Sequence, residues 1–319
     1  MAAVPKNPAI AMRDGVSPSC VALPRHRVVP WASLLDHLVE RMPGVSRQTW
    51  HERMTLGQVL DESGQALAPD APYVNGARVY YWRDLPDESP IPFEAQVLFE
   101  DEHLLVADKP HFLPVTPGGR FVRETLLVRL KQRLNLPDLS PLHRIDRETA
   151  GLVVFSKRPA ERDAYQRLFR ERAVHKRYEA IAPLPTSVAL PCVRRSRIEE
   201  DTVFYRMRET EGEPNSETQI DLLRELGLGL GWYELQPVSG KRHQLRVHMN
   251  ALGCPIVGDQ FYPTVLRGPD EPEDFGAPLQ LLAKTLLFTD PLTGELRRFD
   301  SQRQLVGAAQ GQTRSLTQA

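Results

Sequence analysis

Short apolar segments recur along the last two thirds of the chain, and helical patterns do not alternate with them regularly. Charged or turn-forming residues bound each segment, which is typical of β-strands. The segments are residues 103–109, 151–157, 176–182, 219–225, 231–238 and 279–290. Because regular alternation of strands and helices would indicate a parallel sheet, this pattern predicts an α+β fold with a largely antiparallel mixed sheet.

One helix is predicted within this strand-rich region, over residues 160–173. Pro159 suits a position in the first turn of a helix. Tyr165, Leu168 and Phe169 recur on one face, as expected of an amphipathic helix that packs on the core.

The first 90 residues predict a separate small α/β module. The spacing of Trp31, Leu34, Leu35, Leu38 and Met42 predicts a helix. A second short helix is expected after the N-cap candidate Ser46. Residues 59–70 are then expected to form a strand, a Ser63-Gly64 turn and a strand, and residues 77–83 a closing strand. The module resembles an S4-type RNA-binding fold; the alternative is a domain that only packs.

Two changes in composition suggest where the domains end. Residues 84–103 carry seven acids, three prolines and no Lys or Arg, so their first half is expected to be a linker. The small polar residues 303–319 are expected to form a flexible tail. We therefore predict a module over 1–90, a catalytic domain over 91–302 and a tail over 303–319.

The composition is that of a soluble globular protein, with 41% hydrophobic and 25% charged residues. No apolar run approaches the roughly 18 residues of a membrane span, and Pro5 and Pro8 interrupt any signal-peptide core. Cys20, Cys192 and Cys254 lie far apart, which predicts neither disulfides nor structural zinc. We expect a cytoplasmic monomer without a membrane partner.

The net charge of −1 conceals an uneven distribution. Residues 120–180 hold 15 Lys and Arg against 8 Asp and Glu, whereas the remainder holds 25 against 33. Such a distribution is compatible with one basic face that binds nucleic acid. A helix with a solvated charged face would give the same composition.

Several sequence motifs lack a residue that their chemistry requires. The segment HRID has no accompanying Gly-rich loop or DFG, so it does not indicate a kinase. The segment VSGKR lacks the first glycine and the final Ser or Thr of a phosphate-binding loop. The histidines of HQLRVH are five apart with no Glu between them, which argues against a metal site.

Asp146 stands between Arg144 and Arg147 at the entrance to an apolar strand. Nearby positive charge favours the ionised form of a carboxylic acid, and an ionised carboxylate can act as a nucleophile. Taken alone, the pattern would also fit an ordinary surface acid.

The segment VHKRYEAIA, residues 174–182, predicts a strand with Lys176 and Tyr178 on one face. A tyrosine beside a cation can stack on a base while the cation holds a phosphate. A core tyrosine is the alternative.

A helix is predicted over residues 241–252, because Gly253 and Pro255 follow at positions that end a helix. Leu245, Met249 and Leu252 would then face the core. Arg242 and Arg246, four residues apart, would share another face. The N-terminal end of such a helix favours a carboxylate or phosphate as neighbour.

Four blocks in this order resemble the RluA family of RNA pseudouridine synthases. They are EDEHLLVADKP (100–110), HRIDRETAGLVVFSK (143–157), FRERAVHKRYEA (169–180) and SGKRHQLRVHMNALGCPIVGD (239–259). The resemblance covers roughly residues 95–300. Residues 239–242 read Ser-Gly-Lys-Arg where the family often reads Thr-Gly-Arg-Thr, and Ala150 stands where Ser is common.

The resemblance implies an isomerase that converts uridine in RNA to pseudouridine without a cofactor or metal. The N1–C1′ bond breaks, the uracil turns, and a C5–C1′ bond forms. By resemblance Asp146 is the catalytic carboxylate, Arg246 its ionic partner, and Tyr178 the ring against the uracil. Whether Asp146 attacks the sugar, attacks the base or removes a sugar proton is left open.

The resemblance also implies that the target base leaves its stack, with Arg144 filling the vacated space. Arg147, Lys176, Arg242 and His243 complete the expected substrate-binding set. The RNA partner would be a ribosomal or transfer RNA stem-loop, so the protein would serve rRNA or tRNA processing. The alternatives are a non-catalytic RNA-binding protein on a synthase fold and a glycosylase that releases the base.

Overall fold

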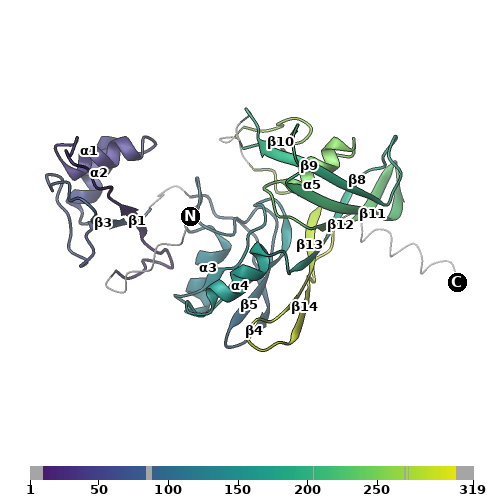
Figure 1. Cartoon of the computed structure of the whole chain (residues 1–319), viewed down its shortest axis with the longest axis horizontal. Coiled ribbons are helices and arrows are strands. Elements are labelled where there is room, and N and C mark those ends of the chain that lie inside the picture. The colour runs from purple at the N-terminus through teal and green to yellow at the C-terminus, as the bar shows by residue number, and fades with distance from the viewer. Residues whose placement is uncertain (1–9, 84–87, 204, 269–270, 272, 307–319) are drawn as a thin grey trace. The chain divides into compact units, whose positions relative to one another are not determined.

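The computed structural model describes residues 10–83, 88–203, 205–268, 271 and 273–306 (Figure 1). These residues divide into two compact units. The first contains the chain up to Glu88 together with Gly119–Arg123 and Lys131–Pro137, and the second contains the rest. The domain boundaries expected at 90 and 302 stay predictions, and the expected linker residues 84–87 lie outside the described residues.

The first unit contains two helices and a three-stranded antiparallel sheet in the order β1-β3-β2. Its elements are β1 (Ser19–Ala22), α1 (Leu34–Arg41), α2 (Arg47–Thr55), β2 (Val59–Leu60) and β3 (Arg78–Tyr81). Both predicted helices are confirmed. Ser33 caps α1 in a capping box with Asp36, and Ser46 caps α2 through the N–H of Thr49. Leu38, Trp50 and Val59 are fully buried between helices and sheet.

The hairpin expected over residues 59–70 is only partly present. After β2, the Ser63-Gly64 turn leads to an isolated bridge between Leu60 and Ala66, so the second strand is missing. Asp61 accounts for this, because its carboxylate accepts the N–H groups of Ser63 and Gln65 and forms a local turn. The third strand of the sheet is instead β1, which pairs with β3 and which the sequence pattern did not indicate.

The second unit is built on an 11-stranded sheet in the order β10-β9-β11-β12-β8-β13-β7-β5-β4, with β14 on β13 and β6 on β7. The strands are β4 (Gln96–Glu100), β5 (Leu104–Lys109), β6 (Ser140–Pro141), β7 (Ala150–Ser156), β8 (His175–Pro183), β9 (Cys192–Glu200), β10 (Met207–Thr210), β11 (Ser216–Gly227), β12 (Leu230–Pro237), β13 (Leu281–Thr289) and β14 (Leu296–Asp300). The β13–β7 pair is parallel and the other described pairs are antiparallel. The predicted α+β class with a largely antiparallel mixed sheet is confirmed.

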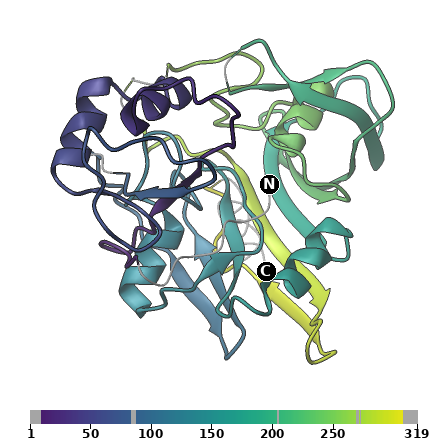
Figure 2. The same cartoon turned by 60° about the vertical axis from the view of Figure 1, so that its left-hand side comes forward.

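Two helices cover separate parts of this sheet. Tyr165 of α4 (Arg162–Arg170) packs with Val106 and Val154, and Leu168 and Phe169 lie against the same cluster. Helix α5 (Gln244–Ala251) packs on the other part of the sheet (Figures 1 and 2). A further helix, α3 (Leu126–Leu134), was not predicted. No helix in the described part of the chain is long and apolar enough to cross a membrane.

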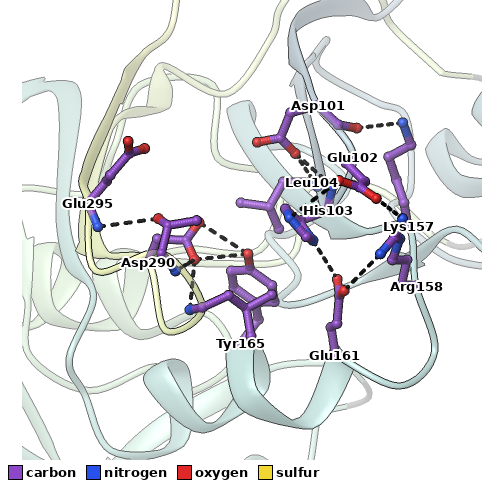
Figure 3. A network of polar contacts seen from close by, with 12 residues as sticks. Asp101, Glu102, His103, Leu104, Lys157, Arg158, Glu161, Tyr165, Asp290 and Glu295 are labelled. Atoms are coloured by element: carbon purple, nitrogen blue, oxygen red, sulfur yellow. Dashed lines mark hydrogen bonds and ion pairs between the residues drawn. The ribbon is translucent and has the colours of Figure 1, made fainter.

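Polar contacts fix α4 at its first turns (Figure 3). The hydroxyl of Tyr165 lies 3.1 Å from both carboxylate oxygens of Asp290, which is buried in the turn between β13 and β14. Glu161, the residue before α4, lies 3.0 Å from Nδ1 of His103 in the turn between β4 and β5. These contacts therefore join α4 to the β4–β5 turn and to the β13–β14 turn, which lie far apart in the sequence.

Both predicted helices of this unit begin later than expected, the first by two residues and the second by three. The first begins at Arg162, and Pro159 lies in a preceding turn rather than in the first helical turn. The second begins at Gln244, because His243 has a left-handed φ of 54° that interrupts the helix. Arg242 therefore lies outside α5 and does not share a helix face with Arg246.

The C-terminal segment is anchored where a flexible tail was expected to begin. The guanidinium of Arg303 donates to the carbonyl groups of Asp108 and Glu94, and Leu305 is buried with Ile181 and Leu282. Residues 303–306 thus belong to the packed unit. The rest of the expected tail, 307–319, lies outside the described residues.

Candidate functional site

Asp146 lies in a short loop between β6 and β7, residues 142–149, which we call the Asp146 loop. Its start is fixed by Val154 of β7, whose carbonyl accepts the N–H of Leu142 at 2.9 Å and whose N–H donates to Nε2 of His143 at 3.2 Å. The imidazole of His143 also stacks on Phe169 of α4, with the ring centres 4.6 Å apart. The loop is therefore held by a strand and a helix.

The end of the loop needs a glycine. Gly151 has a φ of 111°, and a Cβ at this position would lie 2.3 Å from the carbonyl oxygen of Ala283 in β13. A side chain cannot occupy that space. The close approach lets β7 pair with β13 directly after the Asp146 loop.

Two side chains support the loop through its carbonyl groups. The ammonium of Lys109 donates to the carbonyl of Arg147 at 3.0 Å, and Nδ1 of His111 donates to the carbonyl of Glu148 at 2.7 Å. Lys109 is fully buried, and this burial lowers its pKa to about 7, although Glu148 acts in the opposite direction. The carbonyl groups of Arg147 and Glu148, the two residues that follow Asp146, are therefore both hydrogen-bonded.

Arg246 of α5 is fully buried and faces three carboxylates. Its Nε and Nη2 bind Asp259 in a bidentate pair at 2.8 and 2.7 Å. Its Nη1 lies 3.3 Å from Asp146 and 3.5 Å from Glu148. Although burial opposes the charge, the bonds to Asp259 raise the pKa of the guanidinium above its ordinary value. A permanent positive charge thus lies beside Asp146.

Asp259 is positioned as firmly as the arginine it holds. Its Oδ1 also accepts the N–H groups of Phe261 at 2.9 Å and Tyr262 at 3.2 Å. The preceding Gly258 has a φ of 78°, and a Cβ there would lie 2.4 Å from the carbonyl oxygen of Pro278. The orientation of Arg246 is therefore set by a turn that only glycine allows.

Tyr178 and His243 lie close enough to Asp146 to sense its charge. Burial raises the pKa of the Tyr178 hydroxyl, and the negative charge of Asp146 raises it further. Burial lowers the pKa of His243, and Asp146 acts against that shift. Nδ1 of His243 lies 3.1 Å from the hydroxyl of Tyr262. The structure thus brings Asp146, Tyr178, His243 and Arg246 together.

The remaining predicted residues differ in their surroundings. Arg147 pairs with Glu148 at 3.0 Å and Glu273 at 2.6 Å. Arg144 is exposed and makes no hydrogen bond or ion pair with any described residue. Lys176 donates to the carbonyl of Ser239 at 3.0 Å. The exposed Arg242 lies 3.6 Å from Glu200 of β9.

Sequence reasoning missed three residues that shape the site. Glu148 is buried; burial opposes its charge, but Arg246 and Arg147 lower its pKa to about 2. All three residues lie within the segments that resemble the family, but the resemblance assigned none of them a role. For Asp259 the signal was its position after a glycine, whereas nothing marked Glu148 or Lys109. Within the described ranges no group of three or more His, Cys, Asp or Glu could hold a metal ion.

The arrangement joins a partly accessible carboxylate to a buried cation and a neutral phenol. The side chain of Asp146 is 23% exposed, so a substrate atom can reach it, whereas that of Arg246 is 0% exposed. A carboxylate in this setting can act as a nucleophile or as a base. Tyr178 offers an aromatic face for a planar base beside it.

Comparison with known proteins identifies the family to which this chain belongs. Residues 103–251 match the family described as RNA pseudouridylate synthase. An uncharacterized RNA pseudouridine synthase of Synechocystis sp. is 33% identical over 232 residues, which is 72% of this chain and 79% of that protein. The dual-specificity RNA pseudouridine synthase RluA of Haemophilus influenzae is 33% identical over 221 residues, 65% of this chain and 92% of that protein.

A solved structure supports the same assignment. Human RNA pseudouridylate synthase domain containing 4 is 28% identical and superposes with a TM-score of 0.50, covering 66% of this chain and 88% of that one. The chain therefore belongs to the RluA family of RNA pseudouridine synthases, and it is an isomerase that converts uridine in RNA to pseudouridine.

Proposed function

We propose that Asp146 is the catalytic carboxylate of this isomerase and that Arg246 and Tyr178 act with it. The observation that carries the proposal is the 3.3 Å contact between Nη1 of the buried Arg246 and Asp146. The guanidinium stabilises a negative charge on the carboxylate before the reaction and again when the carboxylate is released. The target base lies against Tyr178, where an aromatic ring can stack on it.

Asp146 acts on the flipped uridine in one of three ways: attack on the sugar, attack on the base, or removal of a sugar proton. All three need the carboxylate next to the nucleotide, and its accessibility meets that need. Extrusion of the base costs a few kcal/mol. We assign Arg144 to the vacated space in the RNA, because this exposed guanidinium is two residues from Asp146 and has no partner among the described residues.

The substrate is a structured RNA, ribosomal or transfer or both, bound by cations around the site. Arg144, Lys176 and Arg242 come from three different segments of the chain, and each is exposed or partly so. His243, directly before α5, lies close enough to Asp146 to take part in the same site. Arg147 contributes to the loop through its pairs with Glu148 and Glu273, and any contact with RNA would need these pairs to open. The enzyme is proposed to act as a monomer in the cytoplasm.

The experiment uses total RNA that contains 5-tritiated uridine, from cells that lack this protein. The purified enzyme should release tritium, because the hydrogen on C5 is lost when the new C5–C1′ bond forms. Asp146→Asn keeps the size and most hydrogen bonds of the side chain but removes its charge, so it should release none. Wild-type release by a folded Asp146→Asn protein would falsify the assignment.

The same RNA identifies the substrate and excludes base release. Pseudouridine has the mass of uridine, so a glycosylase would leave an abasic site whereas the isomerase leaves the RNA mass unchanged. Mapping pseudouridine in treated and untreated RNA then names the modified stem-loop. Sites in both ribosomal and transfer RNA would show that the chain acts on both.

A further inference from the structure

Lys176, at the start of β8, carries a charge that the described residues satisfy only in part. Its ammonium has three hydrogen-bond donors, and one of them binds the carbonyl of Ser239 at 3.0 Å. The charged group that acts on it most strongly is Arg172, which has the same sign. No carboxylate of the described residues pairs with Lys176.

Arg172 lies at the tip of the turn between α4 and β8. Its backbone has a left-handed φ of 59°, and its side chain is exposed and makes no ion pair within the described residues. Its charge lowers the pKa of Glu217 on β11, but Glu217 already binds Arg195 at 2.9 Å. Arg172 and Lys176 are therefore two like charges that act on each other, and neither makes an ion pair within the described residues.

Three segments of the second unit meet at Lys176. The turn with Arg172 is one, and the loop between β12 and α5 is another, because the side-chain position of Gly240 lies 3.9 Å from the ammonium. The Asp146 loop is the third, because the charge of Lys176 acts on His143. On β13 the residue paired with Lys176 is the apolar Leu286. The pair of cations thus borders the candidate active site.

We propose that Lys176 and Arg172 form a subsite for one phosphate group of the RNA backbone beside the target uridine. Unpaired positive charge that is partly removed from water is costly, and a phosphate offers oxygen acceptors to its free donors. Lys176 and Tyr178 are two residues apart on one strand, so their side chains share a face. The subsite rests on the proposed function, since the base that lies against Tyr178 brings its backbone to this face.

RNA binding at this subsite should depend on pH, because it requires the protonated form of Lys176. Burial and the charge of Arg172 lower the pKa of Lys176 to about 8, and a bound phosphate would raise it again. The other groups facing Lys176 keep their charge between pH 7 and 9. Arg172 stays positive, and His143 stays neutral because burial lowers its pKa to about 3. Tyr178 stays neutral because burial raises its pKa, and Glu217 stays ionised.

The direction and size of the change in RNA affinity follow from the pKa of Lys176. In the free enzyme about nine tenths of Lys176 is charged at pH 7 and about one tenth at pH 9, whereas the RNA complex requires the charged form. Affinity for RNA should therefore fall about tenfold from pH 7 to pH 9. The fall should begin near pH 8 and have the slope of one proton.

The test measures the affinity of the full-length protein for a fluorescein-labelled oligouridylate at several pH values from 7 to 9. Lys176→Arg keeps a positive charge throughout, so it should lose the part of the fall that the deprotonation of Lys176 causes. Lys176→Met should bind more weakly at pH 7 and should lose the same part of the fall. Arg172→Met removes the like charge, so the fall should move to a higher pH. Lys157→Met is the matched control, because Lys157 already donates to Glu100 at 2.8 Å; it should keep the wild-type profile.

Two results would overturn the subsite. One is wild-type affinity in folded Lys176→Met, and the other is an undiminished tenfold fall in Lys176→Arg. The same proteins are assayed for tritium release from 5-tritiated RNA. Absence of release from wild-type protein would contradict the proposed function, whereas the binding profiles would still decide the subsite.

Discussion

The position of Arg246 depends more on its pair with Asp259 than on its contact with Asp146. The pair is bidentate and both side chains are fully buried, whereas the contact with Asp146 is single and longer. Removing one partner of a buried ion pair leaves an uncompensated charge inside the protein. We therefore regard Asp259 as a positioning residue: it acts on the reaction only through Arg246.

Asp259→Ala should lower the free energy of unfolding by about 3–5 kcal/mol, because it removes the bidentate partner of the buried Arg246 and leaves only the longer contacts with Asp146 and Glu148. Urea denaturation followed by circular dichroism measures this change. Glu217→Ala is the control, since it removes an ion pair whose partners lie at the surface; its effect should be much smaller. Equal effects of the two changes would show that the Asp259 pair does not stabilise the fold.

In the proposed function Tyr178 contributes a ring and a hydroxyl group, and two variants separate their effects. Tyr178→Phe keeps the ring and should retain affinity for RNA, while any step that needs the hydroxyl slows. Tyr178→Ala should also lose stacking of roughly 1–3 kcal/mol. Tritium release gives the turnover and KM of both proteins. Near-normal turnover in both would mean that Tyr178 only packs.

At the scale of elements, the join between the Asp146 loop and the sheet depends on Gly151. Gly151→Ala would place a methyl group 2.3 Å from the carbonyl oxygen of Ala283 and strain a positive φ. Gly227→Ala is a matched change, because Gly227 also has a positive φ, 88°, but open space around its Cβ position. Strain of this kind costs about 1–3 kcal/mol.

We expect Gly151→Ala to lose more stability than Gly227→Ala, because only the first adds a steric clash. The melting temperatures of the two variants measure this difference. Tritium release by the folded fraction of Gly151→Ala should fall as well, since the loop that carries Asp146 ends at the displaced strand. Equal melting temperatures would mean that β7 can move away from β13 at little cost.

The elements that could be predicted from sequence are those with a local signal. Apolar runs identified β5, β7, β8, β11, β12 and β13, and Ser46 marked the start of α2. Residues 192–200 and 207–210 form strands although their sequences are largely polar, because neighbouring strands supply the pairing: 192–200 pair with β11, and 207–210 pair with β9. The start of α5 could not be predicted, because only the surrounding fold places His243 in a left-handed conformation.

The site residues also divide into those that a local sequence motif indicates and those that only a long-range contact places in the site. Asp146, Tyr178 and Arg246 belong to motifs that resemble a family, so their sequence alone suggested roles. Glu148 gained its place only when α5 brought Arg246 beside it, which is a contact between residues about 100 apart in the chain. Long-range contacts of this kind leave no pattern in a single sequence.

For the molecule as a whole, buried histidines predict a loss of stability in mild acid. Burial lowers the pKa of His143 to about 3 and those of His111 and His248 to about 4. In the unfolded chain a histidine titrates near pH 6.5. Between about pH 6.5 and 4 the unfolded state therefore binds more protons, and stability falls as the pH falls.

We expect the free energy of unfolding to fall by up to about 1.4 kcal/mol per pH unit for each of these histidines. Urea denaturation at pH 7, 6 and 5 measures the slope. His248→Gln should reduce the slope by nearly one proton, because His248 is fully buried among Ser196, Ser216 and Thr218. A slope that His248→Gln leaves unchanged would assign the acid sensitivity to other groups.

The first unit is proposed to add RNA affinity, because its sequence resembles an S4-type RNA-binding fold, but cutting the chain near residue 90 would not test this cleanly. Residues 119–123 and 131–137 belong to the same compact unit. Within it, Lys131 donates to Ser17 at 3.0 Å and Gln132 to the carbonyl of Asp14 at 2.6 Å. A truncated protein would lose these partners, so weaker RNA binding could reflect local unfolding.

Reversing the charge of exposed arginines tests RNA binding by the first unit without cutting the chain. Two arginines of α2 already have partners: Arg47 pairs with Asp36, and Arg53 lies 5.3 Å from the ring centre of Trp50. Arg25 and Arg27 are exposed and form no ion pair within the described residues. We therefore expect the double variant Arg25→Glu, Arg27→Glu to bind RNA more weakly than wild type.

The salt dependence of binding shows whether these two arginines contact phosphates. Each phosphate contact on single-stranded RNA contributes a slope of about −0.7 to the plot of log affinity against log salt concentration. If both contacts are lost, the slope of the double variant should be shallower by about 1.4 in magnitude. Turnover at saturating RNA should remain at the wild-type level, because Asp146, Tyr178 and Arg246 belong to the second unit. The same affinity and slope in both proteins would show that the loop carrying Arg25 and Arg27 does not touch the RNA.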